Sequence, residues 1–284
     1  MTFYSRQFIA SGLLVLAGAS PAQDCAVPAM GGAAISNGTA LMVRRPILRV
    51  DADGAPNSYR VDGNGLSDTC DGIVALDAQG KRITPKTDPT GWVAKCRAAW
   101  EQAKASNDYS HVAIFGFMTD KQNRPLIQGP GDPLPGEAYI STSVAMPGTP
   151  SETQRHYVDA AAIPYVVLPG SFVSQHGIKA GTVAVVYRKK TDKFAFAVYG
   201  DAGSDLGEAS VRLHQDLGSD PIVHKGNVAR AAAGIGDPVL IAVFPGAIAT
   251  PLTDAGQWNS SIKSVGEAAL AKLGGIEKLR ACAG

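Results

Sequence analysis

Glycine and proline divide this chain into short apolar runs, and this limits the elements that it can form. Among 284 residues there are 32 glycines and 18 prolines, a pattern that favours strands and turns over a helical bundle. Strands are predicted at 111–117, 138–145, 163–168, 181–188, 194–200 and 238–244. Helices are predicted at 91–106, where apolar residues recur at helical spacing, at 206–217 and at about 260–279, the last one broken at Gly274-Gly275.

The N-terminus has the pattern of a secretory signal. Arg6 supplies the positive charge, an apolar stretch follows from Phe8 to Ala19, and Ser20-Pro21-Ala22 resembles a cleavage site. The apolar stretch is too short for a membrane-spanning helix. We therefore predict a signal peptide at 1–22, an exported catalytic domain at 23–284, and a secreted, extracellular protein with no membrane partner.

The charge balance excludes some classes of partner. Removing residues 1–22, which carry Arg6 and no acidic residue, brings the formal net charge from +1 to zero. Nucleic acid and acidic membrane surfaces require clustered Lys and Arg, so we expect no nucleic-acid partner. Any attraction for a cationic polymer must come from local acidic groups, and we expect the protein to be a monomer.

Four cysteines follow the predicted signal: Cys25, Cys70, Cys96 and Cys282. An even number in an exported chain indicates two disulfides, for which three connectivities exist. We favour a local Cys70–Cys96 bond and a Cys25–Cys282 bond between the two ends. Free buried thiols are the alternative. The cysteines and histidines lack the short paired spacing of a zinc site.

The segment 194–213 carries the strongest indication of chemistry. An apolar run ends at Gly200-Asp201, a glycine-containing turn follows, and Glu208 falls in the first turn of the predicted helix. Two carboxylates that face each other across a gap suit acid–base hydrolysis of a sugar acetal. The alternative is structural: Asp205 and Glu208 also match a capping box, and Asp201 matches a turn-forming residue.

Residues 200–211, with the sequence GDAGSDLGEASV, resemble the signature of glycoside hydrolase family 75, the fungal-type chitosanases. The resemblance continues in order along the chain. Its other blocks are DADGAPNSY at 51–59, YISTS at 139–143, in which the second hydroxyl of the family's Tyr-x-Ser-x-Thr is shifted or replaced, IPYVVLP at 163–169 and VFPG at 243–246.

The resemblance implies that Asp201 and Glu208 are the catalytic carboxylates, of which we take Glu208 to be the acid. It implies inversion of configuration, with no cofactor. Asp51, Asp53, Thr142 and Asp205 are expected to bind substrate. For the fold, we expect by analogy a β-rich α+β protein: a single domain around a closed β-barrel, six-stranded and of the double-psi type, with a few peripheral helices.

The predicted function is therefore that of a secreted endo-chitosanase, which hydrolyses β-1,4 bonds of chitosan or a related amino-sugar polysaccharide. Two alternatives remain open: a non-hydrolytic, expansin-like polysaccharide-binding protein, and a hydrolase of another cell-wall glycan. No metal is expected, because Asp51-Ala52-Asp53-Gly54 lacks the later glycine and glutamate of a calcium loop.

Overall fold

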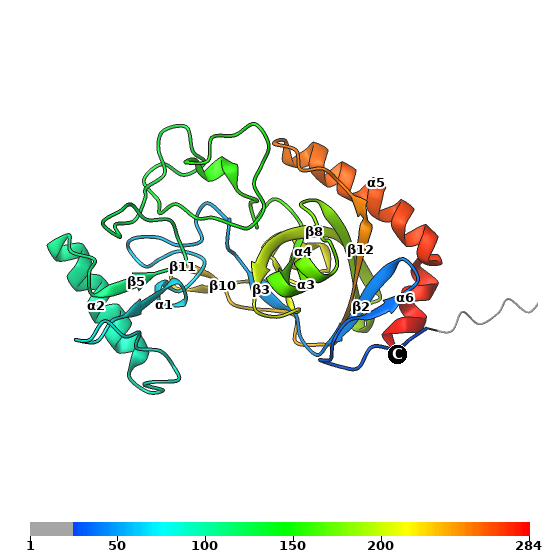
Figure 1. The fold of residues 1–284 in the computed structure, drawn as a ribbon, viewed down its shortest axis with the longest axis horizontal. Helices are drawn as coiled ribbons and strands as arrows, with labels where there is room; N and C mark the ends of the chain where they lie inside the picture. Colours follow the sequence, from blue (N-terminus) through cyan, green and yellow to red (C-terminus); the bar gives the residue numbers. More distant parts are fainter. Residues whose placement is uncertain (1–24) are drawn as a thin grey trace, which may run out of the picture.

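The computed structural model describes residues 25–284, so the predicted signal peptide lies outside the described residues (Figure 1). Its largest element is a mixed eight-stranded sheet with the strand order β1-β2-β12-β7-β8-β6-β9-β3. The strands of this sheet are β1 (Ile35–Asn37), β2 (Ala40–Arg45), β3 (Arg49–Asp51), β6 (Tyr165–Pro169), β7 (Thr182–Arg188), β8 (Lys193–Gly203), β9 (Glu208–Ser210) and β12 (Val239–Ile248).

The centre of the sheet is buried on both faces. Neighbouring residues on β2 show this, because Met42 and Val43 are both almost fully buried but belong to different hydrophobic clusters. One cluster includes Leu213 and Trp258. The other includes Phe244 and residues of the C-terminal helices α5 (Ala255–Leu273) and α6 (Gly275–Ala283). Burial on both faces explains why β7 and β12 have nearly continuous apolar sequences.

The expected closed, six-stranded double-psi barrel is wrong. The sheet has eight strands and two edges, since β1 pairs only with β2 and β3 pairs only with β9. Both edge strands are only three residues long, so neither offers enough backbone groups to complete a barrel by pairing with the other edge. The fold is a mixed α+β structure with an open sheet and several helices.

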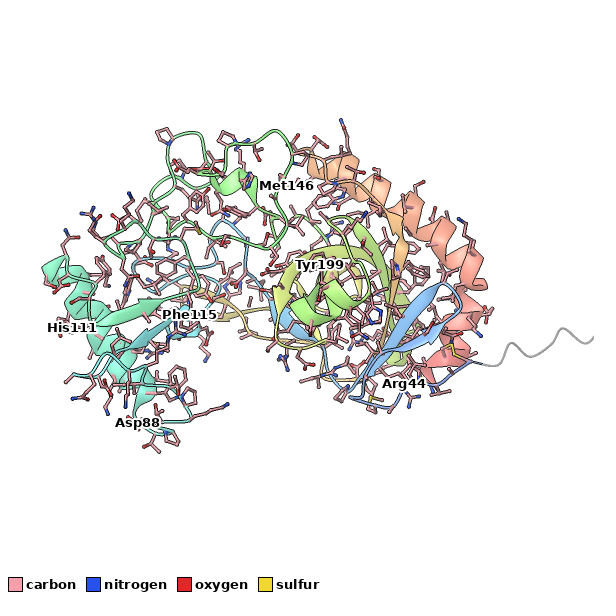
Figure 2. The ribbon with its side chains drawn as sticks, in the orientation of Figure 1. Arg44, Asp88, His111, Phe115, Met146 and Tyr199 are labelled. Atoms are coloured by element: carbon pink, nitrogen blue, oxygen red, sulfur yellow. A yellow bond between two sulfur atoms is a disulfide. The ribbon has the colours of Figure 1, made fainter. Side chains whose placement is uncertain are left out.

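A smaller part of the molecule lies at the opposite end from α5 and α6 (Figure 1). It contains α1 (Thr69–Gly72), α2 (Trp92–Ser106) and a two-stranded sheet of β4 (Ile73–Ala75) and β5 (Val112–Ile114). Its own hydrophobic cluster includes Trp100 and Phe117. Figure 2 places His111 and Phe115 in this part and Tyr199 in the large sheet.

The remaining elements are short. The hairpin of β10 (Ile222–Lys225) and β11 (Val228–Ala231) forms a separate two-stranded sheet. Helices α3 (Gly170–Gln175) and α4 (Val211–Asp216) follow strands of the large sheet, and single 3₁₀ turns occur at Gln154–His156 and Lys189–Thr191. No helix in residues 25–284 has the length and hydropathy that crossing a membrane requires.

Both predicted disulfides are confirmed. Cys70–Cys96 joins α1 to α2 inside the smaller part, and Cys25–Cys282 joins the first described residue to α6. The second bond connects the two ends of the described chain across a sequence separation of 257 residues. Each therefore stabilises a different part of the fold.

Two predicted elements differ from the structure. The expected strand at 138–145 is irregular, because side chains take up its backbone groups: Ile140 N donates to Gln154 Oε1 at 2.7 Å. The expected helix at 206–217 is a short strand, β9, followed by α4, since Ser210 caps α4 by accepting from Leu213 N. The break expected at Gly274-Gly275 in the C-terminal helix is confirmed, because α5 ends at Leu273, α6 begins at Gly275 and Gly274 has a φ of +113°.

Candidate active site

Asp201 lies at a bulge in β8. The register between β6 and β8 pairs Val166 with Tyr199 and Val167 with Asp201, so Gly200 is an extra residue on β8. Only a glycine fits there, because a Cβ on Gly200 would lie 2.4 Å from Cγ of Tyr165. Bulges change the direction in which the following side chain points, and this one sets the orientation of Asp201.

One oxygen of the Asp201 carboxylate accepts three hydrogen bonds. Asp201 Oδ1 receives the Ser143 backbone N–H at 2.9 Å, the Ser143 hydroxyl at 2.8 Å and the Ala202 backbone N–H at 2.7 Å. Ser143 belongs to the long irregular segment between β5 and β6. The three donors fix the carboxyl group and leave Oδ2 as the oxygen that carries a proton when Asp201 is neutral.

Glu208 lies two strands away from Asp201, on the same side of the sheet. Val167 of β6 pairs with Asp201, and Val166 pairs with Ala209 of β9, so Glu208 falls opposite Val167. Two strand spacings correspond to about 10 Å between the Cα atoms of Asp201 and Glu208. Gly203 leaves room for Glu208, whose Oε2 lies 3.4 Å from the position of a Cβ on Gly203.

Two further carboxylates come from β3 and the residues after it. Asp51 Oδ1 accepts from Asp53 N at 2.8 Å, and the Tyr165 hydroxyl donates to Asp51 Oδ2 at 3.1 Å and to Asp53 O at 2.7 Å. Each of Asp51, Asp53 and Asp201 has a carboxylate oxygen within 4.8 Å of the others. Within residues 25–284 none of these three forms an ion pair.

Burial and mutual repulsion favour the neutral forms of these three acids. Burial, then the nearby Asp201, raises the pKa of Asp51 to about 7. Burial, then Asp51, raises the pKa of Asp53 well above its ordinary value. Burial also raises the pKa of Asp201, and Glu208 adds to that rise, while the hydrogen bonds from Ser143 and Ala202 oppose it.

Glu208 is in a different electrostatic environment. Its Oε1 accepts from Arg49 Nε at 2.9 Å, and this ion pair connects neighbouring residues on β9 and β3. A cation in contact with a carboxylate favours its charged form. The site therefore combines a buried carboxyl group with a raised pKa, Asp201, and one that contacts a guanidinium, Glu208.

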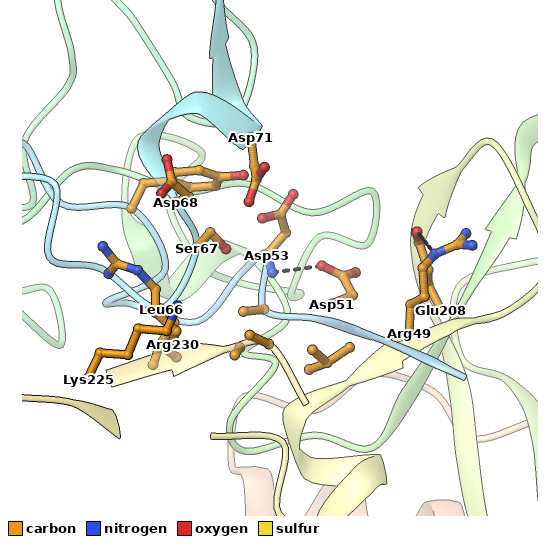
Figure 3. A pocket seen from close by; sticks show the side chains of 15 residues that line it. Arg49, Asp51, Asp53, Leu66, Ser67, Asp68, Asp71, Glu208, Lys225 and Arg230 are labelled. Carbon is orange, nitrogen blue, oxygen red and sulfur yellow. Dashed lines mark hydrogen bonds and ion pairs between the residues drawn. The ribbon is translucent and has the colours of Figure 1, made fainter. Parts of the chain in front are cut away.

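Three of these carboxyl groups, those of Asp51, Asp53 and Glu208, border a cavity of about 600 Å³ between the large sheet and the smaller part (Figure 3). Asp51, Asp53 and Glu208 line it from the sheet side, while Asp68 and Asp71 line it from α1 and its cap. Figure 3 shows Asp53 and Asp71 pointing into the same space from these two sides. The cationic lining residues are Arg49, Lys225 and Arg230.

The three grouped aspartates could also hold a cation, since hard metals such as Ca²⁺ and Mg²⁺ prefer carboxylate oxygens. Their backbone and tyrosine hydrogen bonds, and the raised pKa values, equally suit a site that moves protons. Carboxyl groups with shifted pKa values beside an open cavity are what general acid catalysis requires.

The structure brings four of the six predicted site residues to one place: Asp201, Glu208, Asp51 and Asp53. Thr142 is buried, and its hydroxyl accepts from Val158 N and donates to Val144 O. Asp205 lies beside Glu208 but is ion-paired with Arg45 at 2.5 Å. Both of these side chains are therefore occupied by the protein itself.

Sequence reasoning missed four contributors to the site: Arg49, Ser143, Tyr165 and Asp71. The signal for Arg49 was its position two residues before the acidic block that begins at Asp51. Ser143 and Tyr165 fall inside blocks of the family resemblance, where their hydroxyls offered a signal. Asp71 had no signal, because only the fold places α1 against the cavity.

A comparison with protein families decides the class of the protein. The sequence model described as "Fungal chitosanase of glycosyl hydrolase group 75" matches residues 69–276, which is more than half of the chain. The chain belongs to this family. It is therefore a glycoside hydrolase of the chitosanase type, and its substrate is a polysaccharide.

The matched range places the predicted residues in two groups. Asp201 and Glu208 lie inside the range that matches the chitosanase family, whereas Asp51 and Asp53 precede it. No curated protein matches the chain. The evidence that Asp51 and Asp53 belong to the site therefore comes from the structure and from the sequence resemblance at 51–59.

Proposed function

We propose that this chitosanase is a secreted, endo-acting enzyme that hydrolyses β-1,4 bonds of glucosamine polymer with inversion, using Asp201 as acid and Glu208 as base. The observation that carries this proposal is the contrast between the two carboxyl groups. Burial raises the pKa of Asp201, while Arg49 pairs with Glu208. Two carboxyl groups in opposite environments take the roles of acid and base.

This assignment of roles reverses the expectation from sequence, in which Glu208 was the acid. The expected helix N-terminus at Glu208 already opposed that role, because it favours a charged carboxylate. Glu208 lies instead in β9, where it faces Arg49. The criterion of burial itself is unchanged: the carboxyl group with the raised pKa is the acid.

In the proposed reaction, Asp201 gives its proton to the glycosidic oxygen as the bond from that oxygen to the anomeric carbon breaks. Glu208 takes a proton from a water molecule, whose oxygen attacks the anomeric carbon from the opposite face. This geometry needs carboxyl groups about 6.5–9.5 Å apart. A Cα separation of about two strand spacings, on one side of a sheet, supports such a gap.

The unpaired acids along the cavity support an amino-sugar substrate. Asp51 and Asp53 form no ion pair among the described residues, and Asp71 across the cavity forms none either. A glucosamine unit carries an ammonium group, and an ammonium group bound among these acids would favour their charged forms. Asp205 acts in the proposed site by pairing with Arg45 and Arg49. Thr142 acts by accepting a hydrogen bond from the backbone N–H of Val158.

Secretion is supported by the signal pattern at 1–22 and by two disulfides, which persist in oxidising compartments. Family membership favours the hydrolase over the non-hydrolytic, expansin-like alternative. Another cell-wall glycan as substrate remains an outcome of the test below.

The proposal is tested by Asp201→Asn and Glu208→Gln, each assayed for new reducing ends on chitosans of graded acetylation. We expect each variant to lose at least about a thousandfold in kcat, because each removes one proton-transfer step. Both should keep the thermal unfolding midpoint of the wild type within a few degrees. Normal turnover by either variant would disprove the role assigned to the residue that it replaces. A preference of the wild-type enzyme for fully acetylated polymer would show that chitosan is not its main substrate.

A further inference from the structure

Arg49 is the only cation that an ion pair connects to Glu208 among residues 25–284. The two residues are register partners on β3 and β9, and the contact is 2.9 Å between Arg49 Nε and Glu208 Oε1. The Arg49 side chain is 46% exposed and lines the cavity. Figure 3 shows its guanidinium beside the Glu208 carboxylate at one side of that cavity.

Arg49 is itself held by a second ion pair. Arg49 Nη2 lies 3.7 Å from Asp205 Oδ2, and the same oxygen accepts a hydrogen bond from Arg45 Nη2 at 2.5 Å. Arg45 is mostly buried and packs against Gly207, where a Cβ would lie 3.2 Å from Arg45 Nε. The four side chains form a row from β2 to β9: Arg45, Asp205, Arg49 and Glu208.

We propose that Arg49 is a positioning residue for the base of the reaction: its ion pair keeps Glu208 charged and directed into the cavity, while Asp205 and Arg45 hold Arg49 in place. The inference rests on the proposed function, because it assigns Arg49 a role through Glu208. It gives Asp205 a role within the protein in place of direct contact with substrate.

The surrounding charges show why such a residue is needed. The groups that face Glu208 are Asp51 from β3, Asp53 after it, Asp201 from β8 and Asp205 from the β8–β9 turn. Lys225 and Arg230 border the same cavity from the β10–β11 hairpin, and Arg230 donates to the carbonyl groups of Gly63 and Gly65.

These acidic groups offer Glu208 no counter-charge, and Arg49 is the one cation in ion-pair contact with it among residues 25–284. Glucosamine polymer is cationic in acid, so an enzyme acting on its charged form works at low pH. A base must stay ionised there, and a contacting guanidinium provides this.

The test is the pH profile of kcat/KM on soluble chitosan for Arg49→Met and Arg49→Lys. Without the cation, Glu208 takes up a proton at higher pH, so the acidic limb of the profile moves upward. We expect Arg49→Met to shift its midpoint by about half to one pH unit, because the pair is partly exposed. Arg49→Lys keeps the charge and should restore most of the wild-type profile.

Arg60→Met is the matched control. Arg60 is a similarly exposed arginine that pairs with Asp62 and Glu137, and it does not line the cavity. Its profile should coincide with that of the wild type. If Arg49→Met does not fold, Arg45→Met replaces it with a smaller shift expected in the same direction. An acidic limb at the wild-type pH in folded Arg49→Met, or in its replacement, would overturn the inference.

A second readout does not depend on turnover. The carboxyl ¹³C signal of Glu208, assigned by its loss in Glu208→Gln, is titrated in Asp201→Asn protein with and without Arg49→Met. We expect the titration midpoint to rise when Arg49 is replaced. If Glu208→Gln retains turnover, Glu208 is not the base, whether or not its titration midpoint depends on Arg49. If Glu208 is essential but neither readout moves, the inference about Arg49 alone is wrong.

Discussion

At the scale of single residues, the two proposed catalytic groups differ mainly in what their oxygens contact. Three donors converge on Asp201 Oδ1, two of them from Ser143. A guanidinium contacts Glu208 Oε1. Burial raises the pKa of Asp201 and a cation contacts Glu208, as the proposed acid and base require. Neither contact involves a residue close in sequence to its carboxylate, apart from Ala202.

Ser143 offers a test of this assignment through the acid. Its hydrogen bonds lower the pKa of Asp201, against the larger effect of burial. Ser143→Ala removes the hydroxyl donor, so the pKa of Asp201 should rise. An acid must be protonated to act, so the basic limb of the kcat/KM profile should move to higher pH, by about half a unit. Loss of one hydrogen bond to this group should lower kcat by about tenfold.

Two features separate this role of Ser143 from a merely structural one. Ser143→Thr keeps a hydroxyl and should restore the position of the basic limb, while Ser143→Ala should leave the acidic limb unchanged. The other groups around Asp201 are Asp51, Asp53, Glu208, Tyr165 and Tyr199. A basic limb at the wild-type pH in folded Ser143→Ala would show that Asp201 is not the acid.

The sequence supplied the carboxylates of the site but not their partners. Asp201, Glu208, Asp51 and Asp53 could be chosen because carboxyl groups are what acetal hydrolysis needs and because short motifs contain them. Arg49 and Ser143 could not be assigned roles in this way. Their roles depend on register between strands far apart in sequence, which periodicity within one strand does not determine.

At the scale of elements, the β8 bulge connects packing to chemistry. Gly200 is in contact with the ring of Tyr165, whose hydroxyl holds Asp51 and the Asp53 carbonyl. A side chain at position 200 would displace either Tyr165 or β8. Both displacements would move groups that border the cavity.

Gly200→Ala tests this connection. Its Cβ would lie 2.4 Å from Tyr165 Cγ, and overpacking of this kind typically lowers the free energy of unfolding by about 1–3 kcal/mol. We expect a loss in that range by urea denaturation, with kcat reduced by more than tenfold because Asp201 and Asp51 are both displaced. Gly246→Ala is the control, since nothing lies within 4 Å of its added Cβ. Equal effects of the two substitutions would contradict the role given to the bulge.

Elements with strong periodicity were predicted well, and those defined by tertiary contacts were not. The helix expected at 91–106 is α2, Trp92–Ser106, and the strands expected at 181–188 and 194–200 are β7 and β8. The segment 138–145 was expected to be a strand, and its residues 139–143 resemble a strand of the family. The side chains of Gln154 and Thr142 bond to backbone groups of Ile140 and Val144 instead, which only the fold reveals.

At the scale of the whole molecule, the cavity lies where the large sheet meets the smaller disulfide-linked part. β3, at the free edge of the sheet, supplies Arg49 and Asp51, and the chain continues from it to α1. The barrel expected by analogy would have had no free edge. The open edge is what places the acidic residues of β3 and α1 on opposite sides of one cavity.

The pairing of cysteines could be predicted from sequence because four cysteines allow only three pairings. In the favoured pairing, one bond is local and the other joins the two ends of the exported chain. The order of strands could not, since β12 lies between β2 and β7 although it is the last strand in the chain. Strand order depends on which apolar faces pack together, and β-rich folds of similar composition differ in this respect.

The central claim, hydrolysis by an inverting pair of carboxylates, is tested most directly by following the anomers released from chitosan by ¹H NMR in the first minutes of reaction. Attack by water on a β-1,4 bond from the opposite face gives the α anomer first. The β anomer should appear only later, by mutarotation. The β anomer as the first product would contradict the account, because it would require a covalent intermediate and a closer pair of carboxylates.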